Sequence, residues 1–137
     1  MILTDSGPLV AIIDRADEDH AACVASLSGL RGPMTTTWPV LTEAMYLLGS
    51  RAGWMAQDAL KRLVNRGDIA LNDLGKPDVD RCRALMERYK SLPMDFADAS
   101  LVVLAERLRV RRVFTLDSDF RIYRMDGRRA FEIVPTF

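Results

Sequence analysis

The sequence predicts an α/β protein: a single three-layer domain, residues 1–137, with a central, mostly parallel sheet of about five strands covered by helices. Three observations carry this prediction. Short strand-like runs alternate with longer helical stretches along the whole chain, which implies a parallel sheet covered on both faces. At 137 residues, 49% of them apolar, the chain can bury one sizeable core but not two. Repeats, low-complexity tracts and linkers rich in Pro, Gly or Ser are absent from the sequence.

Five short apolar runs are predicted to be strands. The first ends at Asp5-Ser6-Gly7-Pro8, and the second follows the break at Arg31-Gly32-Pro33. The predicted strands comprise residues 1–4, 34–37, 68–71, 113–116 and 131–135.

The segments between these runs are predicted to be helices, because their ends carry capping or breaking residues. Pro8 fits the first turn of a helix that Asp5 or Ser6 would cap. Gly67 ends the fourth helix, and Pro93 separates the last two. The predicted helices comprise residues 8–13, 17–30, 40–50, 52–65, 76–91 and 96–108, with a short helical turn around 119–124.

Charge is balanced overall but unevenly distributed. Nineteen basic and nineteen acidic residues give a formal net charge of zero, which argues against a strongly basic nucleic-acid binder or a polybasic membrane anchor. Eight arginines lie between Arg107 and Arg129, whereas five acids lie in the first twenty residues. This separation is compatible with solvated helix faces, or with an acidic centre beside a basic wall that suits an anionic polymer.

Cysteine and histidine usage excludes several site classes. Cys23 and Cys82 lack metal-ligand spacing and are expected to be reduced and buried, as in a cytoplasmic protein. The single His20 cannot build a His-rich zinc site. The first residues do not resemble a signal peptide, and no apolar run approaches the roughly 20 residues that span a bilayer, so a cytoplasmic protein without a membrane segment is expected.

Carboxylates follow two of the predicted strands. Asp5 comes directly after the first strand and Asp117 directly after the fourth. In doubly wound sheets, ligands bind beyond the carboxyl ends of the strands where the strand order reverses. If these two strands are neighbours at that point, both carboxylates meet at one edge.

Further acids lie on predicted helices. Glu43 has apolar residues at its helical neighbours three and four positions away, and an isolated buried charge there would be prohibitive. Asp95 and Asp98 lie near a helix start, and Asp119 lies in the turn after Asp117. Capping, or a place at the edge of a core stripe, explains each acid alone.

Together the acids suggest a metal site. Clustered carboxylates repel one another unless a cation neutralises them. Hard divalent ions such as Mg²⁺ or Mn²⁺ take oxygen ligands, acidify bound water and neutralise charge on a phosphoryl oxygen. Acids without His or Cys partners, near an Arg-rich segment, therefore suggest metal-assisted phosphodiester hydrolysis.

Four short segments, taken in order, resemble the PIN-domain family, and most closely the VapC-type ribonuclease toxins of bacterial toxin–antitoxin pairs. Each motif is short, but four in sequence across essentially the whole chain are fairly specific. Gly7-Pro8 departs from the small or hydroxyl residues more usual there, which affects capping more than chemistry. The segments are Ile2-Leu3-Thr4-Asp5-Ser6-Gly7-Pro8-Leu9, Thr42-Glu43-Ala44, Ala97-Asp98-Ala99 and Thr115-Leu116-Asp117-Ser118-Asp119-Phe120.

The resemblance implies an Mg²⁺- or Mn²⁺-dependent endoribonuclease that hydrolyses RNA, usually a homodimer, with a small antitoxin protein that blocks the site. Carried over by motif, the catalytic and metal-binding acids are Asp5, Glu43, Asp98 and Asp117. Asp119 would be an accessory metal ligand and Asp95 a weaker one. Ser6 and Thr115 occupy hydroxyl positions that would hold ligands or water.

Two other functions compete with this one. The first is a non-catalytic PIN-fold module that binds protein or RNA and uses the acids as caps. The second is a phosphotransfer receiver domain, which fits less well because the first strand ends in one acid rather than an adjacent pair and no Lys follows a late strand. Met34, Trp38, Trp54 and Met55 are expected in the core rather than in a binding surface.

Overall fold

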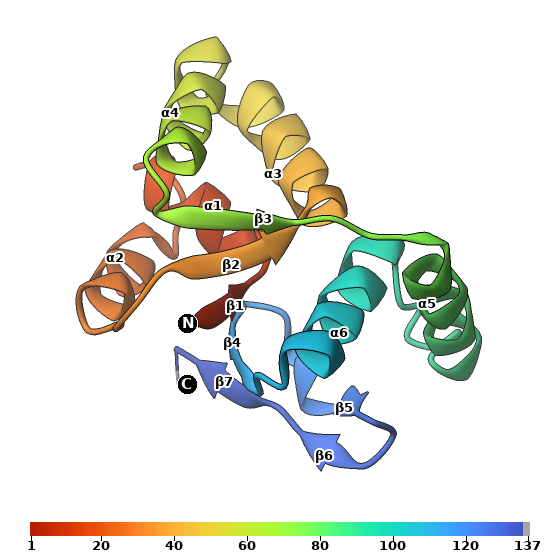
Figure 1. Ribbon diagram of the computed structural model, residues 1–137. Helices are drawn as coiled ribbons and strands as arrows, with labels where there is room; N and C mark the ends of the chain where they lie inside the picture. The colour runs from red at the N-terminus through yellow and green to blue at the C-terminus, as the bar shows by residue number, and fades with distance from the viewer. Residues whose placement is uncertain (136–137) are drawn as a thin grey trace.

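A computed structural model describes residues 1–135, and five parallel strands form its central sheet (Figure 1). The strand order is β3-β2-β1-β4-β7, and every neighbouring pair is parallel. The predicted α/β class and the five predicted strands are therefore confirmed, with shifts of one or two residues at their ends. The strands are β1 (Ile2–Thr4), β2 (Met34–Thr37), β3 (Ile69–Asn72), β4 (Arg112–Phe114) and β7 (Glu132–Val134).

Helices form the two outer layers. Helix α6 packs against β1 and β2 and carries α5 on its outer side, whereas α1, α2 and α4 lie on the other side of the sheet (Figure 1). The helices are α1 (Ser6–Ile13), α2 (His20–Ser28), α3 (Trp38–Arg51), α4 (Trp54–Asn65), α5 (Lys76–Arg88) and α6 (Phe96–Leu108).

Local side-chain chemistry explains where the helix boundaries differ from the predicted ones. Helix α3 begins at Trp38 because Thr37 caps it, through a hydrogen bond from the Val40 N–H at 3.4 Å, and Pro39 lies in its first turn. Helix α2 begins later than expected. Aspartate side chains before it accept hydrogen bonds from the backbone two residues on, as Asp17 does from the Asp19 N–H, and this favours turns over helix.

A two-stranded antiparallel hairpin between β4 and β7 was not predicted. Its strands are β5 (Arg124–Met125) and β6 (Arg129–Ala130). Asp126 and Gly127 in the turn have φ angles of 54° and 75°, the left-handed conformation that Asp-Gly pairs supply in hairpins. The Asp-Gly pair was a usable signal, but strands of two residues are too short to show alternation.

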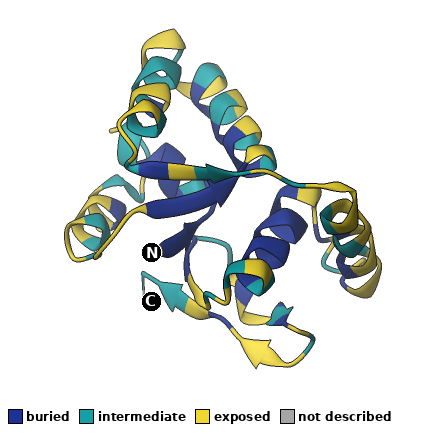
Figure 2. Cartoon of the chain, viewed as in Figure 1, coloured by how far each residue is buried: buried dark blue, intermediate teal, exposed yellow. Residues whose placement is uncertain are grey.

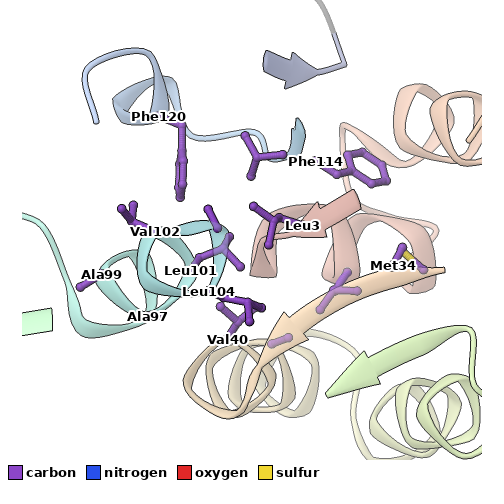
Figure 3. Close-up of a cluster of buried hydrophobic side chains, with 14 of the residues drawn as sticks. Leu3, Met34, Val40, Ala97, Ala99, Leu101, Val102, Leu104, Phe114 and Phe120 are labelled. Carbon is purple, nitrogen blue, oxygen red and sulfur yellow. The ribbon is translucent and has the colours of Figure 1, made fainter. Parts of the chain in front are cut away.

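The hydrophobic core includes buried residues of the sheet and of all six helices, and α6 contributes the longest buried stretch. Nine consecutive residues of α6, from Ala97 to Ala105, are buried (Figure 2). In the close-up, Leu101 and Leu104 of α6 meet Val40 of α3 and Leu3 of β1, and Phe120 points toward α6 from beyond β4 (Figure 3). One acid, Asp98, lies within this buried stretch of α6, so the helix that fills the core also carries a carboxylate into it.

Three large side chains that were expected in the core are exposed. Met34 is buried as predicted, but the exposed fractions are 50% for Trp38, 68% for Trp54 and 77% for Met55. Trp54 and Met55 start α4, where the connection from α3 points away from the sheet (Figure 1). Their position beyond the core, rather than their residue type, decides their exposure.

No helix within residues 1–135 combines the length and the hydropathy needed to cross a membrane.

Candidate metal centre

The site lies at the carboxyl end of the sheet, where the neighbouring strands β1 and β4 end. These strands pair in parallel, with Leu3 opposite Val113 and Thr4 opposite Phe114. The chain builds β2 and β3 on one side of β1, and β4 and β7 on the other, so the strand order reverses here. The condition set out from the sequence, that the first and fourth strands are neighbours, is therefore met. Asp5 lies at this edge, where its N–H donates to the Phe114 carbonyl at 2.9 Å.

Three carboxylates converge at this edge. Asp5, Asp98 and Asp117 each offer an oxygen atom, and these oxygens lie within 4.8 Å of one another. They come from the end of β1, from the first turn of α6 and from the segment after β4. Residues more than a hundred positions apart in the chain therefore share one small volume.

Hydrogen bonds fix the Asp5 carboxylate on both of its oxygens. Oδ1 accepts from the Ser6 N–H at 2.8 Å and caps α1, while Oδ2 accepts from the Thr115 hydroxyl at 2.8 Å. The Thr115 Oγ1 also accepts from the Asp117 N–H at 3.0 Å. One threonine hydroxyl thus connects the Asp5 carboxylate to the backbone of Asp117.

Asp98 and Asp117 are each held by neighbours in their own segment. The Asp98 N–H donates to Asp95 Oδ1 at 2.8 Å, so Asp95 is the N-cap of α6. Asp117 Oδ1 accepts from the Asp119 N–H at 2.9 Å and caps the short 3₁₀ helix η1 (Ser118–Arg121). Capping and clustering are therefore not alternatives: Asp5 and Asp117 do both.

Glu43 approaches the site from α3. The Ser6 hydroxyl, which follows Asp5 in the chain, donates a hydrogen bond to Glu43 Oε1. Glu43 is half-buried and close enough to Asp5 to raise the pKa of that carboxyl. Among residues 1–135, neither Glu43 nor Asp119 belongs to the group of acids within 4.8 Å.

Burial and mutual repulsion disfavour the charged forms of the clustered acids. Burial raises the pKa of Asp5 from 3.8 to about 6, with smaller contributions from Glu43 and Asp117, although the bonds from Thr115 and Ser6 oppose the shift. Burial raises the pKa of Asp98 to about 8, and the charges of Asp5, Asp95 and Asp117 add to the effect. The pKa of Asp117 is raised by burial and by Asp119 and Asp95.

Three of the eight arginines in the segment that could form a basic wall are paired with acids. Salt bridges join Arg107 to Asp78, Arg109 to Asp126, and Arg112 to Glu132. Arg111 donates to the Ala130 carbonyl, and Arg124 donates to three backbone carbonyls.

Arg121 is placed differently from the other arginines of this segment. It is exposed and lines a small hollow that also includes Thr115 and Asp117. Of the eight arginines, Arg121 is the one that lines this hollow together with Asp117.

Tyr123 is a site neighbour that the sequence did not reveal. Its hydroxyl donates to Asp98 Oδ2 at 3.1 Å, and its side chain is fully buried. It lies three residues beyond the last recognisable motif, and one tyrosine in a short helical turn carries no periodic or capping signal.

The chain is similar to known proteins over nearly its whole length. Residues 2–125 match the family model described as PIN domain. The chain is 30% identical over 135 residues to the protein named Ribonuclease VapC26 of Mycobacterium tuberculosis (strain ATCC 25618 / H37Rv), covering 98% of this chain and all of that protein.

Solved structures share the fold. The crystal structure of Mycobacterium tuberculosis VapC20, described as a sarcin-ricin loop cleaving toxin, superposes with a TM-score of 0.82 at 18% identity, covering 87% of this chain and 92% of that chain. A toxin–antitoxin complex from Klebsiella pneumoniae gives 0.67 at 15% identity, covering 88% and 90%.

Proposed function

The chain belongs to the PIN domain family, and we propose that it is an endoribonuclease that hydrolyses RNA with Mg²⁺ or Mn²⁺, as the toxin of a toxin–antitoxin pair. The observation that carries the proposal is the convergence of Asp5, Asp98 and Asp117 within 4.8 Å at the carboxyl end of the sheet. The 30% identity to a protein named as a ribonuclease supports the substrate class. We propose that residues 1–137 act as one domain.

The donor set fits a hard divalent cation. All three side chains offer oxygen ligands, which Mg²⁺ and Mn²⁺ prefer. Burial raises the pKa values of all three acids, so their charged forms need a compensating positive charge. A bound cation would supply that charge, acidify a water molecule and stabilise negative charge on the phosphoryl oxygens.

The protein's own side chains would divide the remaining work. Asp5, Asp98 and Asp117 would hold the ion, directly or through water. Glu43, fixed by the Ser6 hydroxyl on the α1 side of the cluster, would orient the attacking water or accept its proton at a carboxylate oxygen. Asp119 would not supply a direct ligand atom. Its negative charge would act on the site by raising the pKa of its neighbour Asp117.

Incubation of the purified chain with bacterial total RNA tests the proposal. Cleavage is expected with Mn²⁺ or Mg²⁺, should be lost in EDTA and should return when the metal is restored. Single-stranded DNA of matched length serves as the substrate control. Intact RNA under all metal conditions would contradict the proposed activity.

Arg121 is proposed to contact the RNA backbone. It lies beside Asp117 at the hollow described above, whereas Arg128 lies on the exposed hairpin turn. Arg121→Gln is expected to weaken RNA binding and to reduce the slope of log affinity against log salt by about 0.7, the loss of one single-strand phosphate contact. Arg128→Gln is the matched control and should leave both quantities unchanged. Binding is measured by fluorescence anisotropy with Ca²⁺ in place of Mn²⁺; equal salt slopes for the two variants would exclude this role for Arg121.

An antitoxin protein and a second copy of the chain are the proposed partners. The solved toxin–antitoxin complex of the same fold supports the first. Exposed Tyr46, Trp54 and Met55, near the α3–α4 connection, supply apolar surface for a homodimer contact. Light scattering on the purified chain tests the homodimer. Because the proposed substrate is cellular RNA, we also propose that the protein acts in the cytoplasm.

A further inference from the structure

A buried tyrosine hydroxyl contacts the carboxylate cluster from outside the four family motifs. Tyr123 is 0% exposed, and its hydroxyl donates to Asp98 Oδ2 at 3.1 Å. Asp98 is itself 7% exposed, so the bond lies where water competes little.

Aromatic packing fixes the position of this hydroxyl. The Tyr123 ring meets the rings of Tyr89 and Phe120 edge-on, with centroids 5.1 and 5.0 Å away. Phe120 in turn packs edge-on against Phe131, and the Tyr123 N–H donates to the Asp119 carbonyl at 3.1 Å. Ring and backbone are both restrained, so the hydroxyl meets Asp98 in one geometry.

One short segment therefore connects two of the clustered acids. Asp117 caps η1 and contributes its own carboxylate, and Tyr123, two residues after η1, donates to the carboxylate of Asp98 on α6. Any shift of this turn would move one acid directly and rotate the other through the tyrosine.

We propose that Tyr123 is a positioning residue of this site: its hydroxyl fixes the rotation of the Asp98 carboxylate so that the cluster is arranged for a divalent cation before the cation arrives. The inference rests on the proposed metal-dependent function. Partners that orient a metal ligand from behind typically contribute 10–100-fold to metal affinity or activity, and the Tyr123 hydroxyl stands in that relation to Asp98.

The competing explanation is that a buried tyrosine hydroxyl merely needs some acceptor. Tyr89 provides the comparison within this chain. It is also buried, it touches the same aromatic cluster, and its hydroxyl accepts from the Arg124 N–H at 3.1 Å rather than bonding to an acid. Removing either hydroxyl keeps the ring and deletes one hydrogen bond, which is buried for Tyr123 and partly buried for Tyr89. Only Tyr123→Phe removes a bond to Asp98.

The experiment measures Mn²⁺ affinity of the whole chain from the electron paramagnetic resonance signal of free Mn²⁺. Tyr123→Phe is expected to bind Mn²⁺ about 10-fold more weakly than the parent chain, and Tyr89→Phe within about twofold of it. In an Asp98→Asn background, Tyr123→Phe should cause no further loss, because the proposed effect passes through Asp98. RNA cleavage by Tyr123→Phe should recover toward the parent rate at saturating Mn²⁺.

The outcomes separate this inference from the proposed function. If the parent chain binds Mn²⁺ and Tyr123→Phe binds it equally well, or if both tyrosine variants lose affinity alike, the positioning role is wrong and the metal site stands. If the parent chain neither binds Mn²⁺ nor cleaves RNA, the proposed function itself fails.

Discussion

Asp98→Asn is expected to reduce Mn²⁺-stimulated RNA cleavage more than about 100-fold, because even partners that only orient a metal ligand contribute about 10–100-fold. Asp98 offers one of the three oxygens that lie within 4.8 Å of one another, and asparagine replaces its charge with a neutral amide of the same shape. Asp5→Asn is expected to have the same effect for the same reason. The measurement is the initial rate of cleavage of a labelled RNA at a fixed Mn²⁺ concentration.

Stability separates this prediction from simple unfolding. Asp98→Asn removes a buried, poorly compensated charge, so in EDTA at pH 8 the variant should melt at or above the temperature of the parent chain. Asp80→Asn, an exposed substitution on α5, is the matched control and should change neither cleavage nor melting. Full cleavage activity in either cluster variant would refute the assignment of that acid.

The contribution of Asp5 and Asp98 to the stability of the metal-free protein is expected to fall as the pH rises from 4 to 8. The pKa values of Asp5 and Asp98 are about 6 and about 8 in the folded chain, above the ordinary value of 3.8, so the folded state binds more protons than the unfolded state across this window. The contribution of these two groups to the free energy of unfolding is therefore most favourable below pH 4, and it falls as each carboxyl ionises. For Asp5 alone the loss is about 3 kcal/mol, from about 1.4 kcal/mol for each pKa unit.

A divalent cation should reverse this dependence. Mn²⁺ needs the ionised carboxylates, so it should raise the free energy of unfolding much more at pH 8 than at pH 5. Urea unfolding at both pH values, with Mn²⁺ or EDTA, measures the effect, and the Asp5→Asn Asp98→Asn double variant serves as the reference for all other titrating groups. Parallel pH profiles of the parent chain and the double variant would show that these acids do not titrate as proposed.

The sequence was sufficient for the sheet and for the edge at which the acids meet. Each predicted strand had a local signal in the sequence. Ligands bind where the strand order reverses, so the positions of Asp5 and Asp117 after two strands raised the testable possibility that these strands are neighbours. Asp98 needed the family resemblance, because its neighbours on α6 predict only a capped helix start. Its burial depends on how α6 packs against β1 and β2, which no local pattern encodes.

Other features depended on tertiary structure alone. Tyr123 meets Asp98 through an aromatic cluster drawn from three separate segments. Trp54 and Met55 looked like core residues by type and are exposed by position. The arginine-rich stretch was compatible with a basic wall. In the folded chain, however, Arg107, Arg109 and Arg112 form salt bridges with acidic residues.

The most direct test is a crystal of the chain soaked in MnCl₂, with anomalous scattering recorded to locate manganese. We expect a peak at the carboxyl end of β1 and β4, within about 2.1 Å of carboxylate oxygens of Asp5, Asp98 and Asp117 or joined to them by ordered water. A well-ordered cluster with manganese found only elsewhere on the molecule would contradict it.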